Sequence, residues 1–163
     1  MLIIWIDDDD DRVLYPHDNA LVISADVASK QFDQILVDTK SSVNVLFKST
    51  LDEIGITSLR LENTSTSLKG FGRGKLTLFG VVKLPVRIGT SPFQKTMMLD
   101  FVVIGKDNLY QIILGRLFLR ISKAVVSNHY LPLKYRVNGV MRVVKGDQRI
   151  AQSCCTAAAK EVM

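Results

Sequence analysis

The sequence predicts an all-β domain of mainly short strands and a few short helices, closed into a small barrel. Short apolar runs rich in Val, Ile and Leu recur along the chain, and turn-forming residues separate them. Asn138-Gly139 is a strong signal for a two-residue hairpin between residues 130–137 and 140–144. With 163 residues, 47% of them hydrophobic and 23% charged, the chain can bury one core.

The first two strands are expected to form a hairpin. Residues 20–27 alternate and are rich in Val and Ile, residues 28–30 turn the chain, and residues 31–38 form the second strand. An apolar segment follows at residues 43–47, and residues 59–68 are interpreted as an edge strand or loop. The later strands are expected at residues 76–88, 96–104, 111–115, 124–126, 130–137 and 140–144.

Two short helices are expected between these strands. The first begins at Ser49, a good N-cap residue, and ends at Gly55. It turns Leu51 and Ile54 inward. The second covers residues 116–122. Its inward side chains are expected to be Leu117, Phe118 and Ile121.

The uneven charge divides the chain into three parts. The net charge is +5, but residues 1–40 hold three basic and nine acidic residues, while residues 111–163 hold nine basic and two acidic residues. We expect an acidic irregular arm at residues 1–19, the barrel domain at residues 20–146 and a helical tail at residues 147–163.

The stretch that organises the chain is an apolar strand that runs into Asp38. The preceding residues 35–37 predict a buried strand, at whose end a fixed backbone can aim the carboxylate. Four polar residues follow, namely Thr39, Lys40, Ser41 and Ser42. Taken alone, the pattern favours a turn or N-cap aspartate without a chemical role.

Two further stretches contain candidate functional residues. Gly70, Phe71 and Gly72 open a segment with three glycines in five residues, which predicts a mobile hairpin tip. A phosphate-binding loop is the weaker alternative, because neither the Walker spacing nor a strand-loop-helix context follows. The second stretch is a short apolar strand that ends on a glycine. It reads Ile113, Leu114, Gly115 and Arg116.

Together these stretches resemble the retropepsin-like aspartic protease of a plant gypsy-class LTR retrotransposon polyprotein (gag-pol). Residues 35–42 resemble the catalytic turn of the family, which reads apolar-apolar-Asp-Thr-Gly-Ser. Residues 70–72 resemble the flap, and residues 113–116 resemble the apolar-glycine segment that crosses behind the catalytic turn. The resemblance covers residues 15–160, and the order and spacing of its motifs make it specific.

The resemblance implies an aspartic endopeptidase that acts as a homodimer on an extended peptide or polyprotein. Two carboxylates held close share one proton, so that one acts as base toward water and the other as acid toward the carbonyl. Because the sequence has one Asp-Thr turn, the second carboxylate must come from another copy. The resemblance gives Thr39 a hydrogen bond across the dimer axis and makes residues 70–74 a flap. It implies no cofactor and no metal.

Lys40 departs from the family pattern, in which a glycine lies against the substrate. The lysine side chain would occupy the cleft or strain the turn, and its ammonium favours two ionised aspartates over a shared proton. We therefore expect weak or absent catalysis. The alternative function is a catalytically dead β-domain that acts only in dimerisation or peptide binding. The lysine, and an opening methionine inside a polyprotein-like stretch, suggest a decayed element copy or a gene-model fragment.

Other classes of function agree less well with the sequence. The adjacent Cys154 and Cys155 lack a metal-ligand spacing and favour a reducing, intracellular setting, with the cytoplasm expected. Residues 1–6 are apolar but short and meet five aspartates, which predicts neither a signal peptide nor a membrane span. Without a basic-aromatic cluster, and with 7% aromatic residues, nucleic acid is not expected as a partner.

Overall fold

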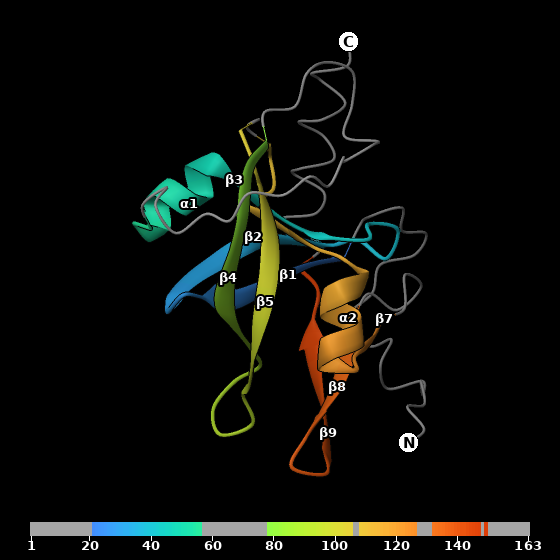
Figure 1. Ribbon diagram of the computed structural model, residues 1–163. Coiled ribbons are helices and arrows are strands. Elements are labelled where there is room, and N and C mark those ends of the chain that lie inside the picture. Colours follow the sequence, from blue (N-terminus) through green and yellow to red (C-terminus); the bar gives the residue numbers. More distant parts are fainter. Residues whose placement is uncertain (1–20, 57–77, 106–107, 127–131, 148, 150–163) are drawn as a thin grey trace.

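Six strands close into a barrel, and a separate three-stranded sheet lies at one end of it (Figure 1). The computed structural model describes residues 21–56, 78–105, 108–126, 132–147 and 149. The strands are β1 (Leu21–Val27), β2 (Lys30–Val37), β3 (Asn44–Phe47), β4 (Leu78–Ile88), β5 (Lys95–Ile104), β6 (Ile112–Leu114), β7 (Val125–Val126), β8 (Pro132–Val137) and β9 (Val140–Lys145). The helices are α1 (Lys48–Ile54) and α2 (Arg116–Ser122). The predicted all-β barrel is confirmed.

The strand order of the barrel is β1-β2-β6-β3-β5-β4. The predicted hairpin of β1 and β2 is confirmed, with Val27 opposite Lys30 and positive φ angles at Ala28 and Ser29. The long antiparallel pair of β4 and β5 forms another wall. The barrel closes where β4 meets β1, at the pair Asp26 and Arg87, whose side chains also form an ion pair. A closed barrel leaves none of these strands with a free edge.

Strand β6 crosses between the two strands that flank Asp38. It runs parallel to β2, with Leu36 opposite Ile113, and antiparallel to β3, with Val45 opposite Ile113. All three residues of β6 are buried. The crossing therefore brings the segment after residue 111 directly against the Asp38 turn.

The interior of the barrel is filled by alternate residues of its strands, as the period of two requires. Its fully buried large side chains include Phe32, Leu46, Leu99 and Phe101 of the strands. Leu51 of α1 and Phe118 of α2 belong to the same cluster. The opposite faces of β3, β5 and β6 form a second buried cluster. It consists of Val45, Phe47, Val102, Ile104 and Ile113. Strands β3 and β6 are thus buried on both faces, which explains their continuous apolar sequence.

Both helices lie where they were predicted, but one predicted N-cap and one predicted inward side chain are wrong. The prediction of Ser49 as N-cap is wrong, because β3 runs directly into α1 and Phe47 occupies the cap position without a side-chain bond. Gly55 ends α1 in the left-handed conformation, as expected. Helix α2 has the predicted range, but Ile121 is 42% exposed. A helix of seven residues turns one narrow face inward, and Phe118 occupies that face.

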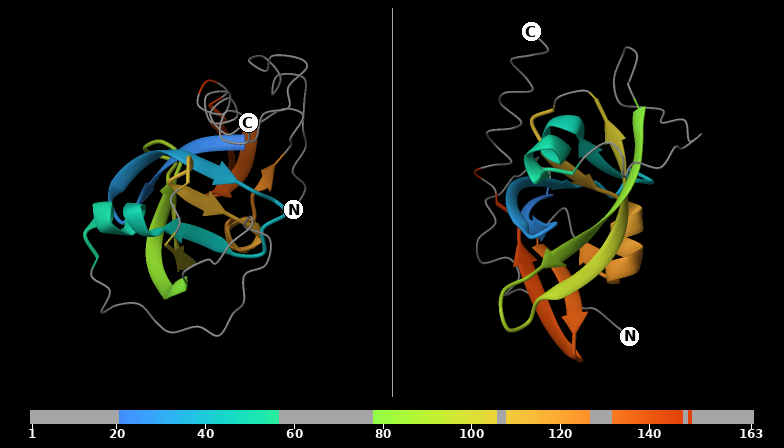
Figure 2. Two further views of the ribbon diagram at one scale, coloured as in Figure 1. Left: turned by 90° about the horizontal axis from the view of Figure 1, so that it is seen from above. Right: turned by 60° about the vertical axis from the view of Figure 1, so that its left-hand side comes forward.

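The second sheet has the order β7-β8-β9 and contains the predicted hairpin. Asn138 and Gly139 both have positive φ, the conformation that a type I′ turn requires. In Figure 1 and in the right view of Figure 2 this hairpin lies at the same end of the molecule as the turn between β4 and β5. Tyr135 joins them, because its hydroxyl donates a hydrogen bond of 2.9 Å to the carbonyl oxygen of Phe93.

Several predictions lie outside the described residues. These are the acidic arm at residues 1–19, the strand or loop at residues 59–68, the glycine-rich tip at residues 70–74 and the helical tail from residue 150 onward. Among the described residues, no helix combines the length and apolar character that crossing a membrane requires.

Candidate active site

Asp38 lies directly after β2, at the start of a tight turn. Its backbone N–H donates to the carbonyl oxygen of Leu114 over 2.9 Å, which fixes the end of β2 against β6. Its Oδ1 atom accepts a hydrogen bond of 2.9 Å from the backbone N–H of Lys40, and its carbonyl oxygen accepts one of 3.2 Å from Ser41. The half-buried carboxylate is thus held by its own turn, at the point where β2 ends beside β6.

The expected proximity of the second apolar-glycine segment to Asp38 is confirmed. Gly115 follows β6 and lies under the turn so closely that a Cβ atom there would stand 2.5 Å from the carbonyl oxygen of Ser41 and 2.4 Å from that of Val43. The N–H of Arg116 donates to the carbonyl oxygen of Ser41 over 2.8 Å. Only glycine allows this approach, because real Cβ atoms do not come so near to backbone oxygens.

Asn44 supports the segment after β6 by hydrogen bonds. The sequence did not mark it as a functional residue. Its side chain is fully buried, and its Oδ1 atom accepts a hydrogen bond of 2.9 Å from the N–H of Gly115. Its Nδ2 atom donates to the carbonyl oxygen of Asp100 over 3.2 Å. One amide thereby ties together β3, β5 and the segment after β6. The available signal was a polar residue between Val43 and Val45, inside an apolar segment.

The remaining turn residues face outward. Thr39, Lys40 and Ser42 are exposed, and the Ser41 hydroxyl donates to the carbonyl oxygen of Val43 over 2.7 Å. Lys40 does not have a positive φ, so the expected strain of the turn is absent there. Among the described residues, Lys40 forms no ion pair.

The chemistry of this site is limited by its single carboxylate. A shared proton needs two carboxylates, and the turn at residues 38–42 carries only that of Asp38. The described residues contain no group of three His, Cys, Asp or Glu side chains that could hold a metal ion. Gly70, Phe71 and Gly72, the expected flap, lie outside the described residues.

The fold is that of the retropepsin-like aspartic proteases. The chain is similar to the retroviral protease-like domain of Ddi1 from Leishmania major, at 15% identity and a TM-score of 0.60 over 80% of this chain and 96% of that one. It is also similar to a retropepsin-like aspartic protease from Rickettsia conorii, at 22% identity and a TM-score of 0.50 over 76% of this chain and 80% of that one. At such identities the likeness shows the fold. No family model and no curated protein matches the sequence.

Proposed function

We propose that this chain is an aspartic endopeptidase domain that hydrolyses extended peptides as a homodimer, with Asp38 contributed by each copy. The position of Asp38 carries the proposal: it stands where β2 ends against β6, in a turn that fixes its carboxylate by a hydrogen bond from Lys40. A second copy would supply the partner carboxylate, since an isologous dimer places equal residues around its two-fold axis. The pair would then hold one proton and activate a water.

The finer parts of the proposal rest on the sequence. The order of motifs supports an origin in the gag-pol polyprotein of a plant gypsy-class retrotransposon, with that polyprotein as substrate and the cytoplasm as compartment. In the dimer, Thr39 would lie near the axis and residues 70–74 would close over the substrate as a flap. Lys40 would weaken catalysis, because it adds bulk and positive charge beside the aspartate pair.

The experiment is a peptidase assay on the purified chain and its Asp38→Asn variant, with peptides that span cleavage sites of such a polyprotein. Cleavage that Asp38→Asn abolishes, together with a dimer in sedimentation, supports the proposal. Cleavage by a monomer, or cleavage that survives Asp38→Asn, would overturn it. Because Lys40 is expected to depress the rate, each form is also assayed as its Lys40→Gly variant.

The exposed, cationic Lys40 also supports a second function, binding without cleavage, because a cation beside the aspartate pair opposes the shared proton. A β-domain that dimerises or binds peptides without cleaving them needs the barrel but no shared proton. Binding of a substrate peptide by both the original chain and Asp38→Asn, with no cleavage by any Lys40 variant, favours this alternative. Its affinity should then be independent of residue 38.

A further inference from the structure

A cavity of about 1060 Å³ lies at the end of the molecule where the β8–β9 hairpin meets the β4–β5 turn. Among the described residues that line it are Phe93, Tyr135, Met141, Arg142, Lys145 and Arg149. None of them belongs to the Asp38 turn or to β6. The volume is at the upper end for sites that hold small ligands, so a peptide segment has room there.

The cavity follows one edge of β9. Residues 141–147 line it without a gap, although consecutive strand residues point to opposite faces of the sheet. Tyr135 of β8, the partner of Arg142 in the hairpin, lines the cavity too, so the cavity includes the sheet face that carries these two side chains as well as the outer edge of β9. In agreement, β9 is the outermost strand in the sheet order β7-β8-β9.

The hairpin geometry gives this edge hydrogen-bonding groups. Asn138 and Gly139 form a two-residue turn, so Val137 and Val140 exchange both of their backbone hydrogen bonds. From there, hydrogen-bonded and non-hydrogen-bonded residue pairs alternate along β8 and β9. The non-bonded positions on β9 are Met141, Val143 and Lys145, whose N–H and C=O groups point away from β8 and toward the cavity. An extended peptide can pair with such groups as an added strand.

The charge of the cavity wall selects the kind of peptide. Arg142, Lys145 and Arg149 face the cavity against one acidic residue, Asp147. The guanidinium of Arg142 is held in place, because it stacks over the Phe93 ring with its centre 3.4 Å from the ring centroid. Opposite charge across an interface speeds association and fixes register. A second copy of β9 would instead bring two sets of these cations together.

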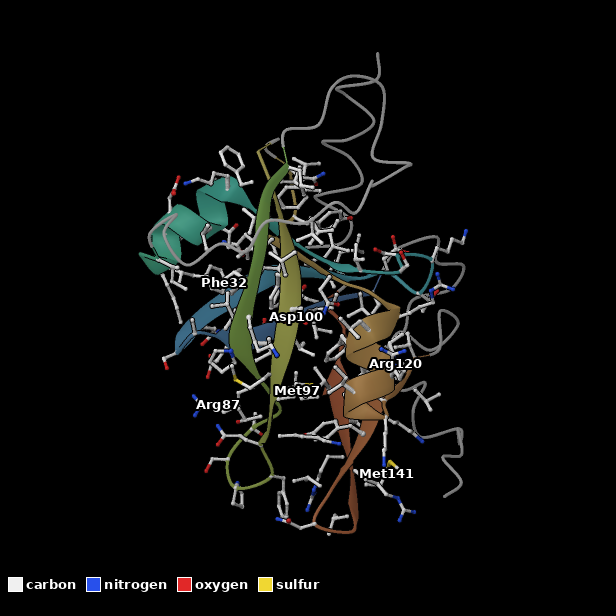
Figure 3. All side chains as sticks on the ribbon, viewed as in Figure 1. Phe32, Arg87, Met97, Asp100, Arg120 and Met141 are labelled. Atoms are coloured by element: carbon white, nitrogen blue, oxygen red, sulfur yellow. The ribbon has the colours of Figure 1, made fainter. Side chains whose placement is uncertain are left out.

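From these observations we propose that the edge of β9 binds an extended acidic peptide of a partner protein, which adds to β7-β8-β9 as a fourth strand. Its carboxylates meet Lys145 and Arg149 at the rim, and its apolar residues contact Met141 and the 40% exposed Val143. Figure 3 labels Met141 on the β8–β9 hairpin and Arg120 on α2, and Arg120 does not belong to the cavity lining. The proposal does not depend on peptidase activity.

The test uses the full chain and a fluorescein-labelled octapeptide of alternating Asp and Val, measured by fluorescence anisotropy. The double variant Lys145→Glu, Arg149→Glu should bind about tenfold or more weakly, because it reverses two rim charges. Arg120→Glu is the matched control, since it makes the same kind of charge change at an exposed residue outside the cavity. It should change the affinity less than about twofold.

A second probe separates strand addition from charge attraction alone. The same octapeptide with alternate amides N-methylated keeps its charge but cannot pair with β9, so it should lose most of its binding to the unchanged protein. Val143→Pro should act likewise, because it removes an outward N–H and leaves the bonds to β8 intact.

Five results would overturn the proposal. These are no binding of the octapeptide, equal binding of its N-methylated form, binding only after deletion of residues 1–19, tighter binding of a single-stranded oligonucleotide, and a dimer that Val143→Pro dissociates. The third result would identify the chain's own acidic arm as the occupant, and the fourth a nucleic acid. A dimer that Val143→Pro dissociates would likewise assign this edge to a second copy.

Discussion

The backbone N–H of Gly115 donates a hydrogen bond of 2.9 Å to the Oδ1 atom of the fully buried Asn44. This bond joins β3 to the segment that supports the Asp38 turn from behind. A buried N–H group that loses its acceptor destabilises the fold by more than the hydrogen bond had stabilised it, because no water can replace the lost acceptor. The geometry of the candidate site therefore depends on a side chain that has no part in its chemistry.

Replacing this side chain should destabilise the fold. Asn44→Ala removes the acceptor of Gly115 and the donor to Asp100, and should lower the free energy of unfolding by about 1–3 kcal/mol. Urea unfolding followed by circular dichroism measures it. Asn108→Ala is the control: it removes one exposed hydrogen bond, accepted from the N–H of Tyr110, and should cost less than about 1 kcal/mol. Equal effects of the two substitutions would contradict the structural role of Asn44.

Gly115→Ala should disturb the Asp38 turn by steric contact. The new Cβ atom meets two backbone oxygens at 2.4 and 2.5 Å, and overpacking of this kind costs about 1–3 kcal/mol. The displaced turn should also weaken the bond from Arg116 to Ser41, which hydrogen exchange of the Arg116 amide detects.

Gly55→Ala is the matched control for that substitution. Gly55 has φ +87 and nothing within 4 Å of an added Cβ, so its cost is conformational, about 1–2 kcal/mol. The Gly55→Ala substitution should leave the hydrogen-exchange rate of the Arg116 amide unchanged under native conditions. Faster exchange in both variants would mean that global unfolding, and not the turn, controls this amide.

The sequence predicted the elements whose signals are local, and it missed those that depend on distant contacts. The Asn138-Gly139 turn and the helix stop at Gly55 both need positive φ, a property that these residues reveal by themselves. Ser49 also has a strong local signal, yet β3 continues into α1 and moves the cap to Phe47. The role of Asn44 could not be predicted, because its partners are 56 and 71 residues away.

The cavity along β9 was equally hidden from the sequence. Its walls come from β1, the β4–β5 turn and the β8–β9 hairpin, which only the closed fold brings together. The basic residues near the C-terminal end were noted as a charge asymmetry, but their spacing gave no sign that Lys145 and Arg149 share one rim. Asp38 differs, because an apolar strand that ends on an acid is a local pattern, and the crossing by β6 agrees with it.

Tyr135 should make stability depend on pH in alkaline solution. Burial raises the pKa of its hydroxyl above the usual 10.0, although nearby Arg142 opposes the shift. A group with a raised pKa in the folded state stabilises fully below its unfolded pKa and loses that contribution as pH rises through the folded pKa. The contribution of Tyr135 should therefore be present at pH 7 and decline above pH 10.

Tyr135→Phe measures this contribution. The variant loses the hydrogen bond to Phe93 and should be about 0.5–1.5 kcal/mol less stable at pH 7. Because phenylalanine does not ionise, the difference from the original protein should shrink as the pH passes 10. Urea titrations at pH 7, 9 and 10.5 follow the difference. A difference that grows above pH 10 would contradict the raised pKa.

The last prediction concerns Lys40 and rests on the proposed endopeptidase function. The shared proton of an aspartate pair is the condition for its catalysis, and an ammonium beside the pair favours the doubly ionised state. The exposed Lys40 side chain follows Asp38 by two residues, and the turn holds it without a positive φ. The effect of Lys40 on rate should thus arise from charge and bulk, and not from backbone strain.

Two substitutions separate these causes. Lys40→Met removes the charge and keeps most of the bulk, while Lys40→Gly removes both. We expect Lys40→Gly to raise the rate about tenfold or more. A tenfold gain corresponds to an activation barrier lowered by about 1.4 kcal/mol. A similar gain for Lys40→Met assigns the effect to charge, and a gain for Lys40→Gly alone assigns it to bulk in the substrate cleft.

The control is Asp38→Asn in the Lys40→Gly chain, which should abolish the gain because it removes the carboxylate that needs the proton. kcat and KM on one polyprotein peptide are measured for all four forms. A chain that cleaves as well with Lys40 as with glycine would contradict this account.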